Sequence, residues 1–108
     1  MKYKNLTPHD IRVFNSKFFL KKNKRPARIV MDTIRTIEED GIIIAEVEPK
    51  IIDLPQEEKG VVYIVSSQCL RHIKDIGRTD VVAPYKVREG SDGKFGCLGF
   101  QRLKKEKK

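Results

Sequence analysis

The fold is decided by residues 60–84, which read GVVYIVSSQCLRHIKDIGRTDVVAP. The stretch opens with an uncharged run from Val61 to Val65, whose β-branched and aromatic residues are typical of a strand buried on both faces. Ser66 and Ser67 follow with hydroxyls that can cap a helix start. Apolar residues then recur at helical spacing as far as Gly77, at Cys69, Leu70, Ile73 and Ile76. This pattern predicts a central strand that runs into a helix through a polar turn.

The start of this predicted helix is also a candidate anion site. Backbone N–H groups and the positive end of the helix dipole point toward a helix N-terminus. Ordinary capping of a helix start also explains Ser66 and Ser67, and it is the favoured of the two interpretations. Both interpretations stay open, and Ser67 is kept as a candidate ligand-binding residue.

Alternating apolar residues bounded by turn residues predict three hairpins, which pair residues 11–14 with 17–20, residues 27–37 with 42–47, and residues 85–89 with 94–100. Asn15-Ser16 is predicted to be a two-residue turn, because Asn tolerates positive φ. Residues 49–59 are predicted to form a loop on account of their prolines and charges, and residues 78–84 a turn. The fold class is therefore α+β, a small antiparallel sheet built from hairpins with one main helix after the central strand.

Length and composition limit the size of the core. The chain has 108 residues, of which 35% are charged and 39% apolar, and it has no Trp. We expect one α+β domain over residues 1–101, followed by a basic, frayed tail over residues 102–108. Association with a second copy would bury more apolar surface, so we expect a homo-oligomer.

The net charge of +8 favours anionic partners such as nucleic acid, nucleotides or a membrane surface. Residues 17–28 hold six basic residues and no acidic one, whereas residues 38–58 hold eight acidic residues against Lys50 alone. Segregation of this kind predicts a basic patch and an acidic edge, although a solvated face fits the lysines as well. The first ten residues contain no apolar signal core, and no apolar run is long enough to span a membrane. We therefore expect a cytoplasmic protein with no membrane partner.

Patterns that indicate an enzyme are missing from the sequence. His9 and His72 lie in no metal or catalytic motif, and neither GxSxG nor a glycine-rich phosphate loop occurs. Cys69 and Cys97 lack the spacing of a metal site and are expected to be buried free thiols. We expect a protein that is not an enzyme, with no metal and no cofactor.

Three groups of polar residues are candidates for ligand binding. Asn5, Thr7 and His9 surround a turn stiffened by proline, where they either hold the turn or contact a ribose or a base edge. Arg28 opens a strand, where its guanidinium either clamps a phosphate or pairs with an acidic residue. Arg78 and Asp80 either pair with each other or bind ligand together. Phe95 and Phe100 are interpreted as core residues rather than as surfaces on which a base stacks.

Several short motifs occur in an order that resembles a known family: NLTPHDIRVF at 5–14, PARI at 26–29, YIVSS at 63–67, RTDVVAP at 78–84 and GxxGC at 93–97. In this order the chain resembles the phage Thoeris anti-defence proteins, which are sponges for cyclic ADP-ribose signals. The resemblance covers nearly the whole chain, and its specificity lies in the combination of motifs.

The resemblance implies a function, a compartment and a set of site residues. The expected protein captures the nucleotide messenger of a host TIR-domain protein in the bacterial cytoplasm, without cleaving it, and could also take cyclic oligonucleotides. It would assemble as a dimer or hexamer with ligand sites between protomers. The matching motifs contain the candidate residues Asn5, Thr7, His9, Arg28, Arg78 and Asp80.

The alternative function is a small basic RNA-binding module. Its basis is the lysine-rich segment at 17–28 together with the basic tail. The sequence lacks RRM and KH signatures and has no Trp for base stacking, so this function ranks second.

Overall fold

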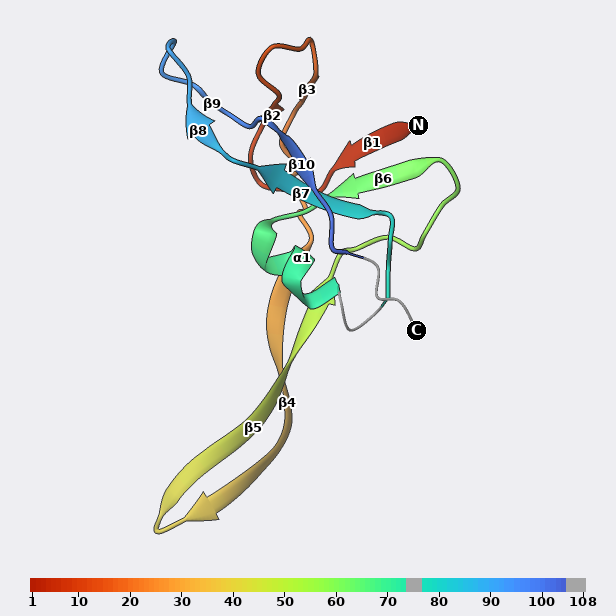
Figure 1. The fold of residues 1–108 in the computed structure, drawn as a ribbon. Coiled ribbons are helices and arrows are strands. Elements are labelled where there is room, and N and C mark those ends of the chain that lie inside the picture. Colours follow the sequence, from red (N-terminus) through yellow and green to blue (C-terminus); the bar gives the residue numbers. More distant parts are fainter. Residues whose placement is uncertain (74–76, 105–108) are drawn as a thin grey trace.

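The computed structural model describes residues 1–73 and 77–104, and its centre is a sheet of four strands (Figure 1). The strands lie in the order β1 (Lys2–Asn5), β6 (Val61–Ile64), β7 (Val81–Tyr85) and β10 (Gly99–Gln101). β1 and β7 both run parallel to β6, and β10 is antiparallel to β7. The fold is broadly α+β, as predicted. The hairpins form small antiparallel sheets, but the main sheet is mixed and not antiparallel.

The strand predicted to be central is confirmed. β6 has a partner on each side, and Tyr63, Ile64 and Val65 are almost fully buried. A single described helix follows it, α1 (Ser67–Ile73), in which the N–H of Cys69 donates to Oγ of Ser66 over 3.2 Å. The helix connects two parallel strands, β6 and β7, which a tight turn cannot do. Ile76, also predicted to be helical, lies outside the described residues.

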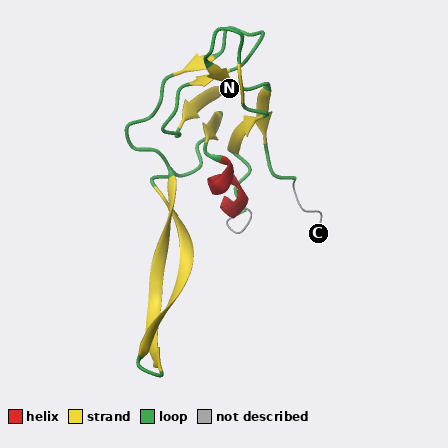
Figure 2. Cartoon of the chain, turned by 90° about the vertical axis from the view of Figure 1, so that its left-hand side faces the viewer, coloured by secondary structure: helices red, strands yellow, loops and turns green. Residues whose placement is uncertain are grey.

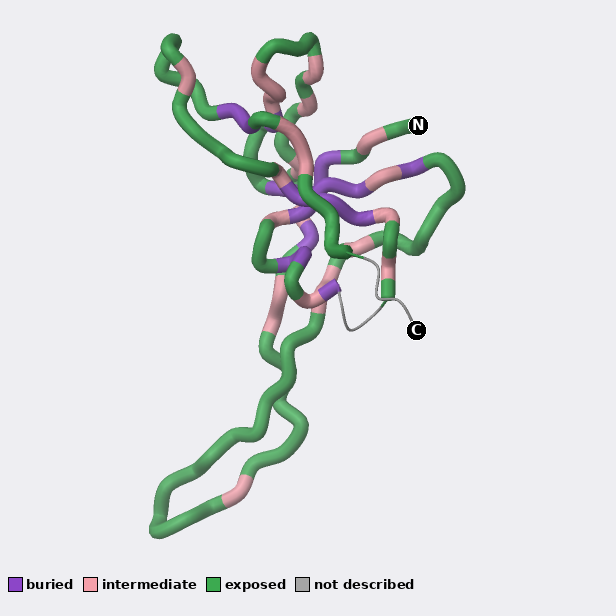
Figure 3. Tube along the Cα trace, in the orientation of Figure 1, coloured by how far each residue is buried: buried purple, intermediate pink, exposed green. Residues whose placement is uncertain are grey.

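Two hydrophobic clusters occupy the two faces of the sheet, because successive residues of β6 point to opposite sides. Tyr63 and Val65 lie in the cluster beneath α1, and Ile64 lies in the other. Tyr3, Phe18 and Phe100 close that second cluster with ring centroids 5.4 to 5.6 Å apart. Figure 3 shows that the buried segments lie together around the central strands and the helix.

The cysteines agree with a further prediction. Cys69 and Cys97 are both buried free thiols, as predicted. In the described part of the chain, no helix has the length and apolar character to cross a membrane.

The first predicted hairpin is confirmed with a longer turn. β2 (Ile11–Arg12) pairs with β3 (Phe19–Leu20), and the N–H of Val13 also donates to the carbonyl of Phe18 over 3.3 Å. The turn is therefore four residues long, and Asn15 has the expected positive φ of 62°.

The second predicted hairpin is a long ribbon that leaves the body of the protein (Figure 2). β4 (Arg28–Glu39) pairs with β5 (Ile42–Ile52), and the turn at Asp40-Gly41 has φ values of 53° and 81°. The prediction that residues 49–52 belong to a loop was wrong, because Pro49 pairs opposite Met31. Each strand of a two-stranded ribbon has one free edge that faces solvent. A proline is tolerated there, because no neighbouring strand needs a hydrogen bond from its N–H.

The C-terminal hairpin is shorter than predicted. β8 (Arg88–Glu89) pairs with β9 (Phe95–Gly96), whereas residues 81–85, predicted to be largely turn, form the buried strand β7. The chain turns between β7 and β8 at Lys86, where φ is 51°. The predicted strand 85–89 is therefore divided between two sheets.

Candidate functional site

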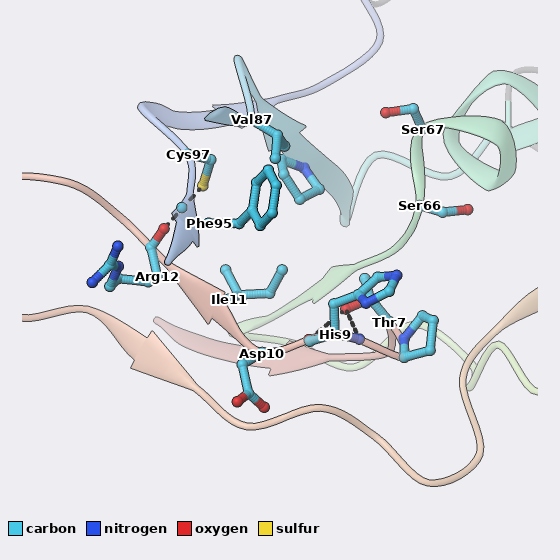
Figure 4. A pocket seen from close by; sticks show the side chains of 13 residues that line it. Thr7, His9, Asp10, Ile11, Arg12, Ser66, Ser67, Val87, Phe95 and Cys97 are labelled. Atoms are coloured by element: carbon cyan, nitrogen blue, oxygen red, sulfur yellow. Dashed lines mark hydrogen bonds between the residues drawn. The ribbon is translucent and has the colours of Figure 1, made fainter. Parts of the chain in front are cut away.

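A cleft of about 430 Å³ opens where the turn after β1, the start of α1 and the β8–β9 hairpin meet. Figure 4 shows its lining, with Phe95 and Val87 on one side and His9 and Ser66 on the other. The volume lies within the range of roughly 300–1,000 Å³ that small-molecule sites occupy.

One wall of the cleft is apolar. Ile11, Pro84, Val87 and Phe95 line it. Phe95 is 68% exposed and Val87 is 59% exposed. The interpretation of Phe95 as a core residue was therefore wrong, whereas Phe100 does pack in the core. An exposed ring above an apolar floor is a surface on which a planar group can stack.

The opposite wall carries polar groups from three of the predicted site residues. Thr7, His9 and Ser67 all line the cleft, together with Ser66. Within the described residues, neither the His9 imidazole nor the Ser67 hydroxyl makes a hydrogen bond, whereas the Ser66 hydroxyl caps α1. Two groups that can donate or accept thus face the apolar wall.

Asn5 lies beneath this wall and holds it in place. Its Nδ2 donates to the carbonyls of His9 (2.8 Å) and Lys21 (3.0 Å), and its Oδ1 accepts from the N–H of Thr7 (2.9 Å). The Thr7 hydroxyl lies 2.7 Å from Asn5 Oδ1 and 2.9 Å from the His9 carbonyl, and donates its one proton to either. Asn5 is 8% exposed and Thr7 4%. The structure therefore places Asn5 as the holder of the turn.

Arg78 and Asp80 lie away from the cleft, in the segment that precedes β7. The guanidinium makes two hydrogen bonds of 2.7 Å to the carboxylate and a third of 2.9 Å to the carbonyl of Pro55. The hydrogen bonds to Arg78 lower the pKa of the Asp80 carboxyl, and those to Asp80 raise the pKa of Arg78. Of the two alternatives for these residues, this geometry favours the structural pair.

Arg28 does not line the cleft either. It begins β4, is exposed, and lies opposite Ile52 of β5. Of the seven candidate residues, the structure thus brings Thr7, His9 and Ser67 to one cavity, supports it with Asn5, and leaves Arg28, Arg78 and Asp80 elsewhere.

A polar latch fixes the hairpin that carries Phe95. Arg12 makes hydrogen bonds of 2.7 and 3.1 Å to Asp92 and one of 2.9 Å to the carbonyl of Lys94. The guanidiniums of Arg12 and Arg88 lie 5.2 and 5.7 Å from the ring centre of Phe14. The bond to Arg12 lowers the pKa of the Asp92 carboxyl. Sequence reasoning missed this latch, because nothing local marks Arg12 as the partner of a residue 80 positions away.

Gly96 lets this hairpin approach β2, which predicts a sharp effect of adding a methyl group. A Cβ at Gly96 would lie 2.9 Å from Cζ of Phe14 and 3.1 Å from the carbonyl oxygen of Arg12. We expect Gly96→Ala to lower the free energy of unfolding by about 1–3 kcal/mol, measured by chemical denaturation. Gly99→Ala is the matched control, because nothing lies within 4 Å of its Cβ position. Equal stability of the two variants would contradict this packing.

Comparisons of the chain with protein-family models, with curated proteins and with solved structures gave no match. Within residues 1–73 and 77–104, no group of three or more His, Cys, Asp and Glu is placed to hold a metal ion. A function for the cleft therefore has to come from its own chemistry.

Proposed function

We propose that the protein binds a small nucleotide in this cleft and sequesters it without cleaving it. The observation that carries the proposal is the exposed ring of Phe95, which faces the polar groups of His9 and Ser67 across a cavity of about 430 Å³. The resemblance to the Thoeris anti-defence sponges gives the class of ligand, a cyclic ADP-ribose-type messenger of host TIR-dependent immunity.

Each part of such a ligand has a matching wall. A purine stacks on Phe95 above Ile11, because every base has a π-face that an aromatic ring accepts. Ribose hydroxyls meet the imidazole of His9 and the hydroxyl of Ser67, which exchange hydrogen bonds with them. The phosphates stay near solvent, where the net charge of +8 attracts them over a distance.

The remaining reactive groups in the lining favour binding over cleavage. Burial raises the pKa of the Cys97 thiol, which keeps it protonated and a poor nucleophile. Asp10 accepts a hydrogen bond of 2.8 Å from the N–H of Lys22, and Figure 4 shows its carboxylate pointing away from the aromatic wall. The Ser66 hydroxyl is engaged at the helix start.

Removal of the Phe95 ring tests the proposal. Phe95→Ala should weaken the binding of cyclic ADP-ribose roughly 5- to 150-fold, because base stacking on an aromatic side chain contributes about 1–3 kcal/mol. Isothermal titration calorimetry measures the affinity, and the melting temperature should stay unchanged because the ring is mostly exposed.

Arg28→Ala is the matched control, because it removes a large exposed side chain that does not line the cleft. It should bind ligand like the parent protein. A loss of affinity in Arg28→Ala with none in Phe95→Ala would move the site to the start of β4 and contradict the proposal.

The exposed lysines favour RNA binding as a second candidate function. Lys17, Lys21, Lys22 and Lys24 all face solvent in the segment around β3. Binding to a polyanion weakens steeply as salt rises, because many phosphates are neutralised at once. A ligand in the cleft carries few phosphates and should respond weakly to salt, so a titration between 50 and 200 mM salt, the range over which polyanion binding falls roughly 10³–10⁵-fold, separates the two functions.

A further inference from the structure

The ribbon formed by β4 and β5 is an arm that pairs with no other strand of the described residues. At its base Ile29 and Ile51 pack against the cluster beneath α1. Beyond them the arm stands clear of the body, as Figures 1 and 2 show, and Figure 3 shows most of it exposed. The large apolar side chains exposed along it are Met31, Ile34, Ile42, Ile43, Ile44 and Val47.

An arm of this kind is poorly stabilised alone. A two-stranded ribbon is marginally stable in water without a further strand or a packed face. Ile43 is 72% exposed, and the register places it on the same face as Ala45, Val47 and Pro49, which alternate along β5. Contiguous exposed apolar residues mark interaction surfaces, so the arm is built to contact something.

The charge of the arm indicates what it contacts. Residues 31–49 hold six acidic residues and one basic residue, which is a net charge of −5. Because the whole chain has a net charge of +8, the remaining residues together carry +13. Asp32 lies directly opposite Glu48, and like charges so placed repel each other. A cationic partner between them would turn this repulsion into attraction.

The body of the protein carries a matching surface. A groove of about 540 Å³ runs beside β1, the outer strand of the described four-stranded sheet. Tyr3 and Leu20 contribute apolar area to it, and its basic residues are Lys4, Lys21, Lys22 and Lys24. We call it the lysine groove.

We propose that the arm of one copy docks in the lysine groove of a second copy, and that the exchange is reciprocal in a two-fold symmetric dimer. Arm and body attract, with −5 on one and +13 on the other. Two arms packed against each other would instead bring two charges of −5 together. A second copy supplies both surfaces at once, which an isologous interface requires.

Charge reversal on the arm tests this contact. In Asp32→Lys/Glu48→Lys two lysines replace two acids at opposed positions, so the arm keeps a like-charged pair while its net charge falls from −5 to −1 and most of its attraction to the groove is lost. Sedimentation velocity should show the parent as a dimer and this variant as a monomer, with self-association at least about 100-fold weaker. Glu57→Lys/Glu58→Lys, with the same change of charge in the exposed loop before β6, should remain a dimer.

The complementary change of charge in the groove gives the decisive comparison. Lys21→Glu/Lys22→Glu should be monomeric alone, and mixing it with the arm-reversed variant should restore a dimer. In the mixed dimer the new lysine pair of one arm meets the new glutamate pair of the groove, while the unchanged arm meets the unchanged groove. If the arm-reversed variant does not fold, the groove-reversed variant tests the same contact by itself, and its persistence as a dimer would overturn the proposal.

Three other results would also overturn it. The first is a monomeric parent protein at tens of micromolar. The second is tighter association at high salt, which indicates contact between like-charged arms. The third is a groove-reversed variant that remains a dimer but no longer co-purifies with RNA. That result would make the groove a site for polyanions.

Discussion

Replacing Asn5 with alanine should destabilise the fold and abolish ligand binding together. The side chain bridges three backbone groups and the Thr7 hydroxyl within a buried turn. Alanine leaves the buried N–H of Thr7 without its acceptor and removes the amide donor to the carbonyls of His9 and Lys21. We expect the free energy of unfolding to fall by about 2–4 kcal/mol, measured by urea denaturation. Calorimetry should show no binding of cyclic ADP-ribose, because Thr7 and His9 lose their positions.

Asn23→Ala is the matched control for this prediction. Its amide donates over 3.1 Å to the backbone carbonyl of Asn5, and it contacts neither the Thr7 hydroxyl nor the His9 carbonyl. It should cost about 1 kcal/mol of stability and leave the affinity within a few fold. If Asn5→Ala binds ligand as tightly as Asn23→Ala does, the turn does not position the site.

The second large effect is expected at Asp80, whose removal leaves Arg78 without its charge partner. The two side chains are only 17% and 10% exposed, for Arg78 and Asp80 respectively. Asp80→Asn should lower the free energy of unfolding by about 3–5 kcal/mol, because breaking a largely buried pair leaves an uncompensated charge. Asp92→Asn breaks a more exposed pair and should cost much less.

The pH dependence of stability tests the Arg78–Asp80 pair independently. The pKa of Asp80 in the folded protein lies below its ordinary value of 3.8, because of the hydrogen bonds from Arg78. Its stabilising contribution is present above the unfolded pKa and is lost as pH falls through the folded pKa. Urea denaturation between pH 7 and pH 2 should therefore show a steeper acid loss in the parent protein than in Asp80→Asn. Parallel curves would contradict the ion pair.

Local sequence chemistry was enough for the strands and turns that need only near neighbours. The uncharged run at 61–65 predicted β6, and Asp40-Gly41 and Asn15 adopt the positive φ that their residue types allow. β1 was not predicted, because Lys2 and Lys4 leave no apolar run in this segment, although the strand is paired along its length with β6. Parallel pairing between residues about 60 positions apart leaves no local signal.

The candidate site was predictable only in part for the same reason. Thr7 and His9 were found because short polar side chains around a proline indicate a structured turn. Phe95 was missed as a cleft residue, because a phenylalanine in an alternating strand is usually buried and its exposure here depends on where the β8–β9 hairpin lies. Arg78 and Asp80 satisfy each other locally, two residues apart, which sequence alone could not separate from a shared ligand.

The most direct test of the proposed function is ligand depletion followed by recovery. The purified protein is incubated with cyclic ADP-ribose, the free ligand is separated by filtration and quantified by liquid chromatography and mass spectrometry, and the retained protein is then heated. Sequestration predicts that the ligand disappears from the filtrate in proportion to protein and returns after heating with its mass unchanged. Ligand that stays in the filtrate, or that returns as a linear cleavage product, would contradict a non-catalytic nucleotide sponge.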